Sequence, residues 1–104
     1  MRLIEIPNRG VALYTSALGK ALLAHLDLRE REDLIGRLEL RPMTPNTIVD
    51  RGRLRKELEA IRRQGWSEDR EENLTGVSCV GAAILDAEGR ALAALSVTGP
   101  SARN

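Results

Sequence analysis

Three side chains of the sequence could do nucleophilic or acid–base chemistry: Cys79, His25 and Asp69. A thiol, an imidazole and a carboxylate can act as nucleophile, base and orienting acid when the fold brings them within hydrogen-bond reach. No motif places His25 near the thiol, and His25 falls on the apolar stripe of a predicted helix. A cysteine-dependent enzyme is therefore the weaker alternative, and the sequence predicts no catalytic residue.

The residue counts argue against several other kinds of site. One cysteine and one histidine cannot form a closed zinc site, and a lone cysteine cannot form a disulfide within the chain. One Trp, one Tyr and no Phe leave too few rings to stack nucleic-acid bases. The net charge of +1 is spread along the chain and is no footprint for tight phosphate binding. The sequence therefore predicts no metal, no cofactor and no direct DNA contact.

Apolar segments of the chain are too short for a membrane protein. The longest, residues 77–85, is far below the roughly 20 residues that a membrane span needs. Nothing at the amino end resembles a charged-then-apolar secretion signal. With its single thiol, the sequence predicts a cytoplasmic protein that has no membrane partner.

The elements that must position these residues begin with a helix over residues 16–26. Thr15 or Ser16 can cap its first amides, because both side chains carry a hydroxyl that accepts a hydrogen bond. The helical spacing predicts one core-facing stripe, formed by Leu18, Leu22, His25 and Leu26.

Two further helices are predicted from their caps. Asp27 caps one that ends near residues 37–39, and Asp50 caps another that ends at Gly65, a suitable left-handed stop. Two prolines within residues 41–46 exclude a helix there and predict a surface loop. On the third helix we expect i,i+4 ion pairs on a solvated face, Arg53 with Glu57 and Arg55 with Glu59.

The second half of the chain has the period of strands. It predicts an extended segment over residues 66–72, a buried strand over 77–85 and another strand over 91–97. Residues 86–90 supply a turn between the last two strands, with Gly89 at positive φ.

A short apolar segment at residues 3–6, ended by turn residues, predicts one more strand at the start. No linker or repeat divides the chain, and 104 residues suffice for one core. The sequence therefore predicts a single α+β domain over residues 1–104, in which helices pack on an antiparallel sheet.

Several motifs in order resemble the IclR-type bacterial transcription regulators. Residues 17–24 resemble the family's A-x-G-K-A-x-L-A segment, residues 44–48 its T-x-x-T-I loop, and residues 54–65 its L-x-x-E-L-x-x-I-R-x-x-G helix. Residues 96–100 resemble its closing S-x-S-G-P. The family's spacing is also followed by Asp69, Glu72, Gly76, Cys79 and Ala82.

The resemblance implies a GAF-like effector domain that binds small organic acids or related metabolites and associates with copies of itself as a dimer or tetramer. In the family, DNA is contacted by a winged helix-turn-helix domain, which we do not find in this chain. We expect the sensing domain itself to be truncated at both ends. A module for oligomerisation alone stays open as an alternative, because a truncated domain exposes apolar surface or sheet edges.

The resemblance also implies a site for the effector. The family's effector-contacting positions at the start of the first helix match Ala17 and Leu18, beside the cap Ser16. Free amides and the helix macrodipole favour an anion there. Leu18 is bulkier than the small residue often found there. The remaining effector contacts match Asp69, Cys79, Ser96 and Thr98.

Each of these residue types suits a polar ligand. Ser96 and Thr98 are two apart, so both hydroxyls point to one face of a strand. Asp69 can accept a hydrogen bond from a ligand hydroxyl, and Cys79 offers a small, polarizable contact surface to the ligand. The chain departs from the family at Gly81, where alanine is common, and at Ala83, where proline is common.

Overall fold

Four helices precede three strands in residues 11–101, the part of the chain that the computed structural model describes. The strand expected at residues 3–6 lies outside the described residues. The elements are α1 (Val11–Thr15), α2 (Ala17–Ala24), α3 (Leu28–Arg37), α4 (Arg51–Gln64), β1 (Ser67–Arg70), β2 (Val77–Leu85) and β3 (Ala91–Pro100).

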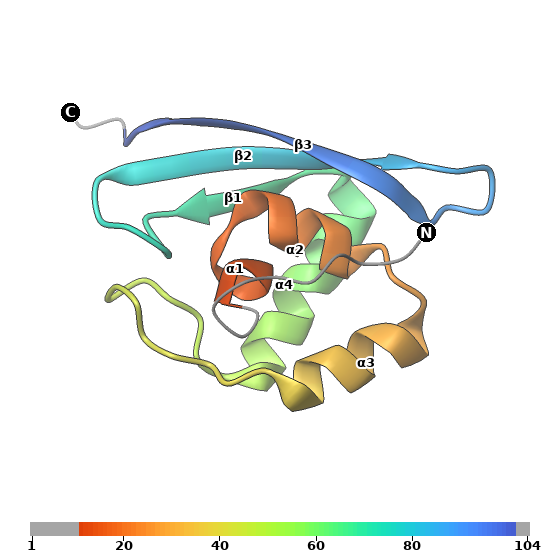
Figure 1. Ribbon diagram of the computed structural model, residues 1–104, viewed down its shortest axis with the longest axis horizontal. Helices are drawn as coiled ribbons and strands as arrows, with labels where there is room; N and C mark the ends of the chain where they lie inside the picture. Colours follow the sequence, from red (N-terminus) through yellow and green to blue (C-terminus); the bar gives the residue numbers. More distant parts are fainter. Residues whose placement is uncertain (1–10, 102–104) are drawn as a thin grey trace.

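The strands form an antiparallel sheet in the order β1-β2-β3, and the helices lie on one side of it (Figure 1). This arrangement confirms the predicted α+β class. The turn between β2 and β3 holds Gly89 at a φ of 84°, as predicted. β3 runs to Pro100, three residues beyond the predicted end at Val97, because its pairing with β2 continues to Val77.

The predicted caps position α2, α3 and α4. Ser16, Asp27 and Asp50 each accept a hydrogen bond from a backbone amide of the helix that follows. Gly65 ends α4 at a φ of 91°, a left-handed conformation that glycine adopts without steric cost. Short polar side chains at the right places therefore fix the three helix starts.

Helix α1 was not predicted, because its five residues are too few to show a helical period. Tertiary contacts stabilise it: Leu13 and Tyr14 are buried, and the Tyr14 hydroxyl accepts a hydrogen bond from the Arg41 amide at 2.6 Å. A five-residue helix depends on such contacts, since helix nucleation is unfavourable in isolation.

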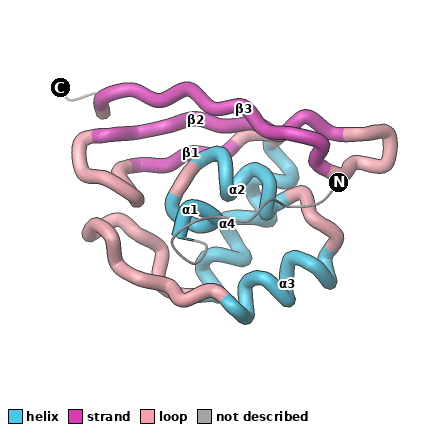
Figure 2. Tube along the Cα trace, in the orientation of Figure 1, coloured by secondary structure: helices cyan, strands magenta, loops and turns pink. Residues whose placement is uncertain are grey.

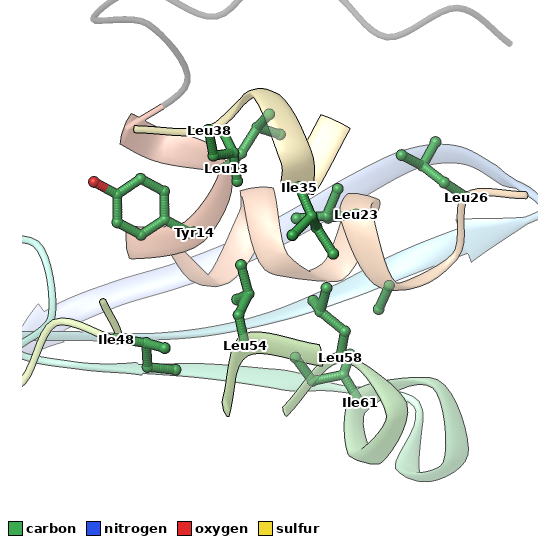
Figure 3. Close-up of a cluster of buried hydrophobic side chains, with 11 residues drawn as sticks. Leu13, Tyr14, Leu23, Leu26, Ile35, Leu38, Ile48, Leu54, Leu58 and Ile61 are labelled. Atoms are coloured by element: carbon green, nitrogen blue, oxygen red, sulfur yellow. The ribbon is translucent and has the colours of Figure 1, made fainter. Parts of the chain in front are cut away.

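The hydrophobic core lies within the helix layer. Aliphatic side chains of α2, α3 and α4 meet beneath the sheet, with Tyr14 at one end (Figure 3). Its labelled members are Leu13, Tyr14, Leu23, Leu26, Ile35, Leu38, Ile48, Leu54, Leu58 and Ile61.

The prediction of a buried strand over residues 77–85 was wrong. Only Gly81 of β2 is buried, and Val80 and Ile84 are about half exposed. Side chains alternate across a sheet, and the described helices cover only one face. The apolar run therefore reflects a second, uncovered face.

The ion pairs predicted within α4 were also wrong in their partners. Glu57 pairs with Lys20 of α2, and Glu59 pairs with Arg31 of α3 at 3.0 Å. Arg55 pairs with Glu32 of α3 at 2.8 Å. The charged residues of α4 thus connect α4 to α2 and α3 instead of connecting successive turns of α4.

Helix α2 packs closely on β2 at Gly81. A Cβ atom placed on Gly81 would lie 2.9 Å from the carbonyl carbon and oxygen of Ala17 and 3.1 Å from Ser67 Oγ. Ser67 Oγ donates a hydrogen bond to the Ala17 carbonyl at 2.5 Å. The glycine that departs from the family pattern is therefore what allows the first turn of α2 to touch the sheet.

Substitution of Gly81 tests this packing. We expect G81A to lower the free energy of unfolding by about 1–3 kcal/mol, because a backbone segment would have to shift. The control G36A lies in α3, where a Cβ meets nothing within 4 Å, and should leave stability unchanged or raise it by up to about 1 kcal/mol. Urea denaturation measures both, and equal stabilities for G81A and the wild type would contradict the packing.

Candidate functional site

The residues predicted to contact an effector come together where the start of α2 meets the sheet. A Cβ on Gly81 would point at Ala17, so this face of β2 is the one that carries the helices. Cys79 lies two residues away on the same face, and Ser96 and Thr98 pair with Gly81 and Cys79 from β3. Asp69 joins them from β1, because its Cα partner is Cys79.

The first turn of α2 supplies the backbone amides of this site. Ser16 Oγ accepts a hydrogen bond from the Gly19 amide at 2.9 Å, and Lys20 N donates to the Ser16 carbonyl. The first amides of a helix lack partners within the helix, so those of Ala17 and Leu18 define the positive end of its dipole. Ala17 is fully buried under this turn.

Leu18 does not lie on the core-facing stripe that its spacing predicted. Its side chain is 39% exposed, at the rim of the site, while Leu22 and Leu23 are buried. The other three predicted members, Leu22, His25 and Leu26, are buried, as is every residue of α2 except Leu18. Leu18 is therefore free to narrow the opening above the sheet.

The strands contribute a thiol, two hydroxyls and a carboxylate. Cys79 Sγ and Thr98 Oγ1 lie 3.2 Å apart, within hydrogen-bond distance. Ser96 and Thr98 are exposed, whereas Asp69 is 3% exposed. The site is thus buried at β1 and open at β3.

One oxygen of Asp69 is already used by the protein. Asp69 Oδ1 accepts a hydrogen bond from the Glu72 amide at 2.7 Å and so closes the turn after β1. The other oxygen, Oδ2, takes no part in this bond. This second oxygen is the one that could accept a hydrogen bond from a ligand.

The seven residues lie on the helix side of the sheet, with Ala17 and Asp69 buried and Leu18, Ser96 and Thr98 exposed. None of them lines either of two hollows: one of about 530 Å³ between α4, β1 and the loop at residues 45–48, and one of about 100 Å³ near His25. A ligand here would be held from one side by α2 and from below by the strands.

His25 does not join Cys79 and Asp69. It follows the last turn of α2 and lines the smaller hollow together with Ala91, whose strand partner is Leu85. Leu85 lies six residues along β2 from Cys79, which is about 20 Å in a strand. The residues of the enzyme alternative are therefore far apart.

Burial and the nearby Arg62 guanidinium both lower the pKa of His25. Each acts against the protonated form, the first by desolvation and the second by repulsion of like charge.

The described residues contain no group of histidine, cysteine and carboxylate side chains that could hold a metal ion.

Ser67 is a site-forming residue that the sequence analysis missed. Its hydroxyl is fully buried and contacts the carbonyls of Ala17 and Gly81 at 2.5 and 3.3 Å. It stands two residues before Asp69, so strand alternation places both side chains on the helix face. That alternation was the available signal.

Comparison with known proteins identifies the chain. Residues 9–104 match the family described as "Bacterial transcriptional regulator IclR C-terminal". The chain belongs to this family. Its members are domains of transcription regulators and are not enzymes.

Individual relatives agree with the family match. The HTH-type transcriptional repressor AllR of Klebsiella pneumoniae is 42% identical over 91 residues, which are 88% of this chain and 34% of AllR. The IclR protein of Thermotoga maritima is 42% identical, with a TM-score of 0.81 over 86% of this chain and 36% of that protein. The chain thus spans about a third of the length of these regulators.

A third relative was solved with a small molecule. It is a double mutant of the PobR inducer-binding domain from Acinetobacter in complex with 3-hydroxybenzoic acid. It is 30% identical to this chain, with a TM-score of 0.77 over 85% of this chain and 50% of that domain.

No helix in residues 11–101 of our chain is long and apolar enough to cross a membrane.

The lowered pKa of His25 makes stability depend on pH. Below about pH 6.5 the unfolded chain binds a proton at His25 more readily than the folded chain does. We therefore expect the stability contributed by neutral His25 to be complete above about pH 6.5, and the free energy of unfolding to decrease as the pH falls below that value. His25 is the only histidine in the chain, so H25Q removes this effect alone. Urea denaturation at pH 7.5 and pH 5 should show a larger loss for the wild type than for H25Q. A larger loss for H25Q would mean that the sign is wrong.

Proposed function

We propose that this chain is the effector-binding part of a transcription regulator and that it binds a small organic acid on the helix side of the sheet, beside the first turn of α2. The geometry supports this proposal most strongly: the amino end of α2 lies on the same face of the sheet as Asp69, Cys79, Ser96 and Thr98. The inducer-binding domain of PobR, a relative at 30% identity, supports a carboxylic acid as the ligand class.

The chemistry of the site assigns a role to each end of the ligand. A carboxylate would bind the amides of Ala17 and Leu18, where the helix dipole favours negative charge. Asp69 repels a second anion but accepts a hydrogen bond, so it would hold a hydroxyl or another donor. Ser96 and Thr98 could donate to or accept from the same ligand. The arrangement favours a small acid that also carries a donor group.

The effector would act on DNA through another part of the regulator. The AllR repressor is described as HTH-type, and this chain matches 34% of its length. We propose that ligand binding here changes the DNA affinity of a helix-turn-helix domain in the whole protein. Such coupling requires that the ligand bind two states of the regulator unequally.

Association of copies is a second candidate function, favoured by the sheet face opposite the helices. Val80, Ile84, Leu95 and Val97 are 47–77% exposed there and form a contiguous apolar surface. We expect sedimentation equilibrium to give a mass above that of a monomer for the wild type and a monomer for L95E. A monomeric wild type would exclude this candidate.

A thermal-shift screen tests the effector proposal. We expect at least one small carboxylate, from a panel of oxo, hydroxy and aromatic acids that includes 3-hydroxybenzoate, to stabilise the protein in a saturable manner. The matching neutral amides should not. A panel without any saturable stabiliser would count against sensing of organic acids by this chain.

Variants then locate the site. T98V keeps the shape of the side chain and D69N keeps an acceptor, so both should retain the fold and weaken binding by about tenfold, the effect of one lost hydrogen bond to a charged group. D33A on α3 is the matched control, because Asp33 is exposed and lies away from the site. Unchanged affinity in both T98V and D69N would show that the ligand binds elsewhere.

A further inference from the structure

We infer that Lys20 is a positioning residue of the proposed effector site, because it holds the turn after β1 that is hydrogen-bonded to Asp69 and links that turn to α4. The inference rests on the proposed function for the identity of the site. Lys20 belongs to α2, one turn after the amides that would bind the ligand carboxylate.

Lys20 is a fully buried cation with two carboxylate partners. Its Nζ atom lies 2.7 Å from Glu72 Oε1 and 2.5 Å from Glu57 Oε2, and its side chain is 0% exposed. Glu72 is 7% exposed and Glu57 is 36% exposed. A buried ammonium is tolerated only when it is paired, and removing it leaves uncompensated carboxylates. The three residues therefore form one unit.

Glu72 connects this unit directly to the effector site. The Glu72 amide donates to Asp69 Oδ1 at 2.7 Å, and Glu72 Oε2 accepts from the Arg70 amide at 2.9 Å. One residue thus binds Lys20 with its side chain and Asp69 with its backbone. If Glu72 moves, Asp69 loses the hydrogen bond that orients its carboxylate.

The T-x-x-T loop holds the same turn from the other side. Thr47 Oγ1 donates to the Glu72 carbonyl and Thr44 Oγ1 donates to the Glu71 carbonyl, each at 2.5 Å. Figure 2 shows this loop beside the turn that follows β1. Both threonines are buried. The motif thus fixes the backbone of the turn, while Lys20 fixes its one buried side chain.

The link to α4 runs through Glu57. This residue lines the hollow of about 530 Å³ between α4 and β1, and its carboxylate shares the Lys20 ammonium with Glu72. A change in the position of α4 would alter how Lys20 divides its hydrogen bonds between the two carboxylates. Lys20 therefore connects the orientation of Asp69 to the position of this helix.

Amide hydrogen exchange tests the inference without a ligand. In K20M we expect the Glu72 amide to exchange at least about tenfold faster than in the wild type. This acceleration should exceed that of the Leu58 amide in the middle of α4. A purely structural role of Lys20 would accelerate both amides by the same factor through the loss of global stability. Equal acceleration would overturn the inference.

R31M is the matched control, because Arg31 is another buried cation paired with two carboxylates, Glu32 and Glu59. It should affect the Glu72 and Leu58 amides alike. If K20M does not fold, E72Q keeps the shape of the side chain and should produce the same selective acceleration at a smaller size. An unchanged exchange rate of the residue-72 amide in E72Q would also contradict the role of Lys20.

Calorimetry with the carboxylate that best stabilises the wild type gives a second readout. We expect K20M to weaken its binding about tenfold and R31M to change it less than about twofold, since only the first loosens Asp69. A wild type that binds no carboxylate would refute the proposed function, while the exchange result would still decide whether Lys20 positions the turn. Unchanged binding by K20M would refute the inference alone.

Discussion

The first turn of α2 packs directly on β2, and this contact sets the geometry around it. A side chain at residue 81 would collide with the backbone of Ala17, and Ser67 bonds to the same carbonyl. This approach brings the positive end of a helix dipole onto the strand face that carries the polar side chains. The geometry of the proposed effector site is a consequence of that packing.

Apolar and polar contacts occupy different parts of the helix layer. Aliphatic side chains fill the space between α2, α3 and α4, and they account for most of the buried core. The end near β1 is polar, with a buried lysine, two glutamates and two threonines that hold one turn. Such a network is costly to assemble but specific, because every buried polar group requires its own partner.

Much of the fold could be predicted from local chemistry. Ser16, Asp27 and Asp50 are short acceptors at helix starts, and Gly65 and Gly89 stand where the backbone turns left-handed. These signals act within a few residues, so one sequence suffices to read them.

The features that could not be predicted depend on residues distant in sequence. Leu18 is exposed because α2 turns Ala17 toward the sheet, and β2 is exposed because the described helices cover one face only. Glu57 pairs with Lys20 instead of a neighbour on its own helix. The positions of the site residues came from the family resemblance, while the strand register explains why they share a face.

Amide chemical shifts would show whether an organic acid binds on the helix side of the sheet, beside the first turn of α2. In a titration of the ¹⁵N-labelled protein with a stabilising carboxylate, we expect the largest shifts at Ala17, Leu18, Ser96 and Thr98. Shifts centred on Arg53, Trp66 and Arg70, which line the hollow between α4 and β1, would contradict it.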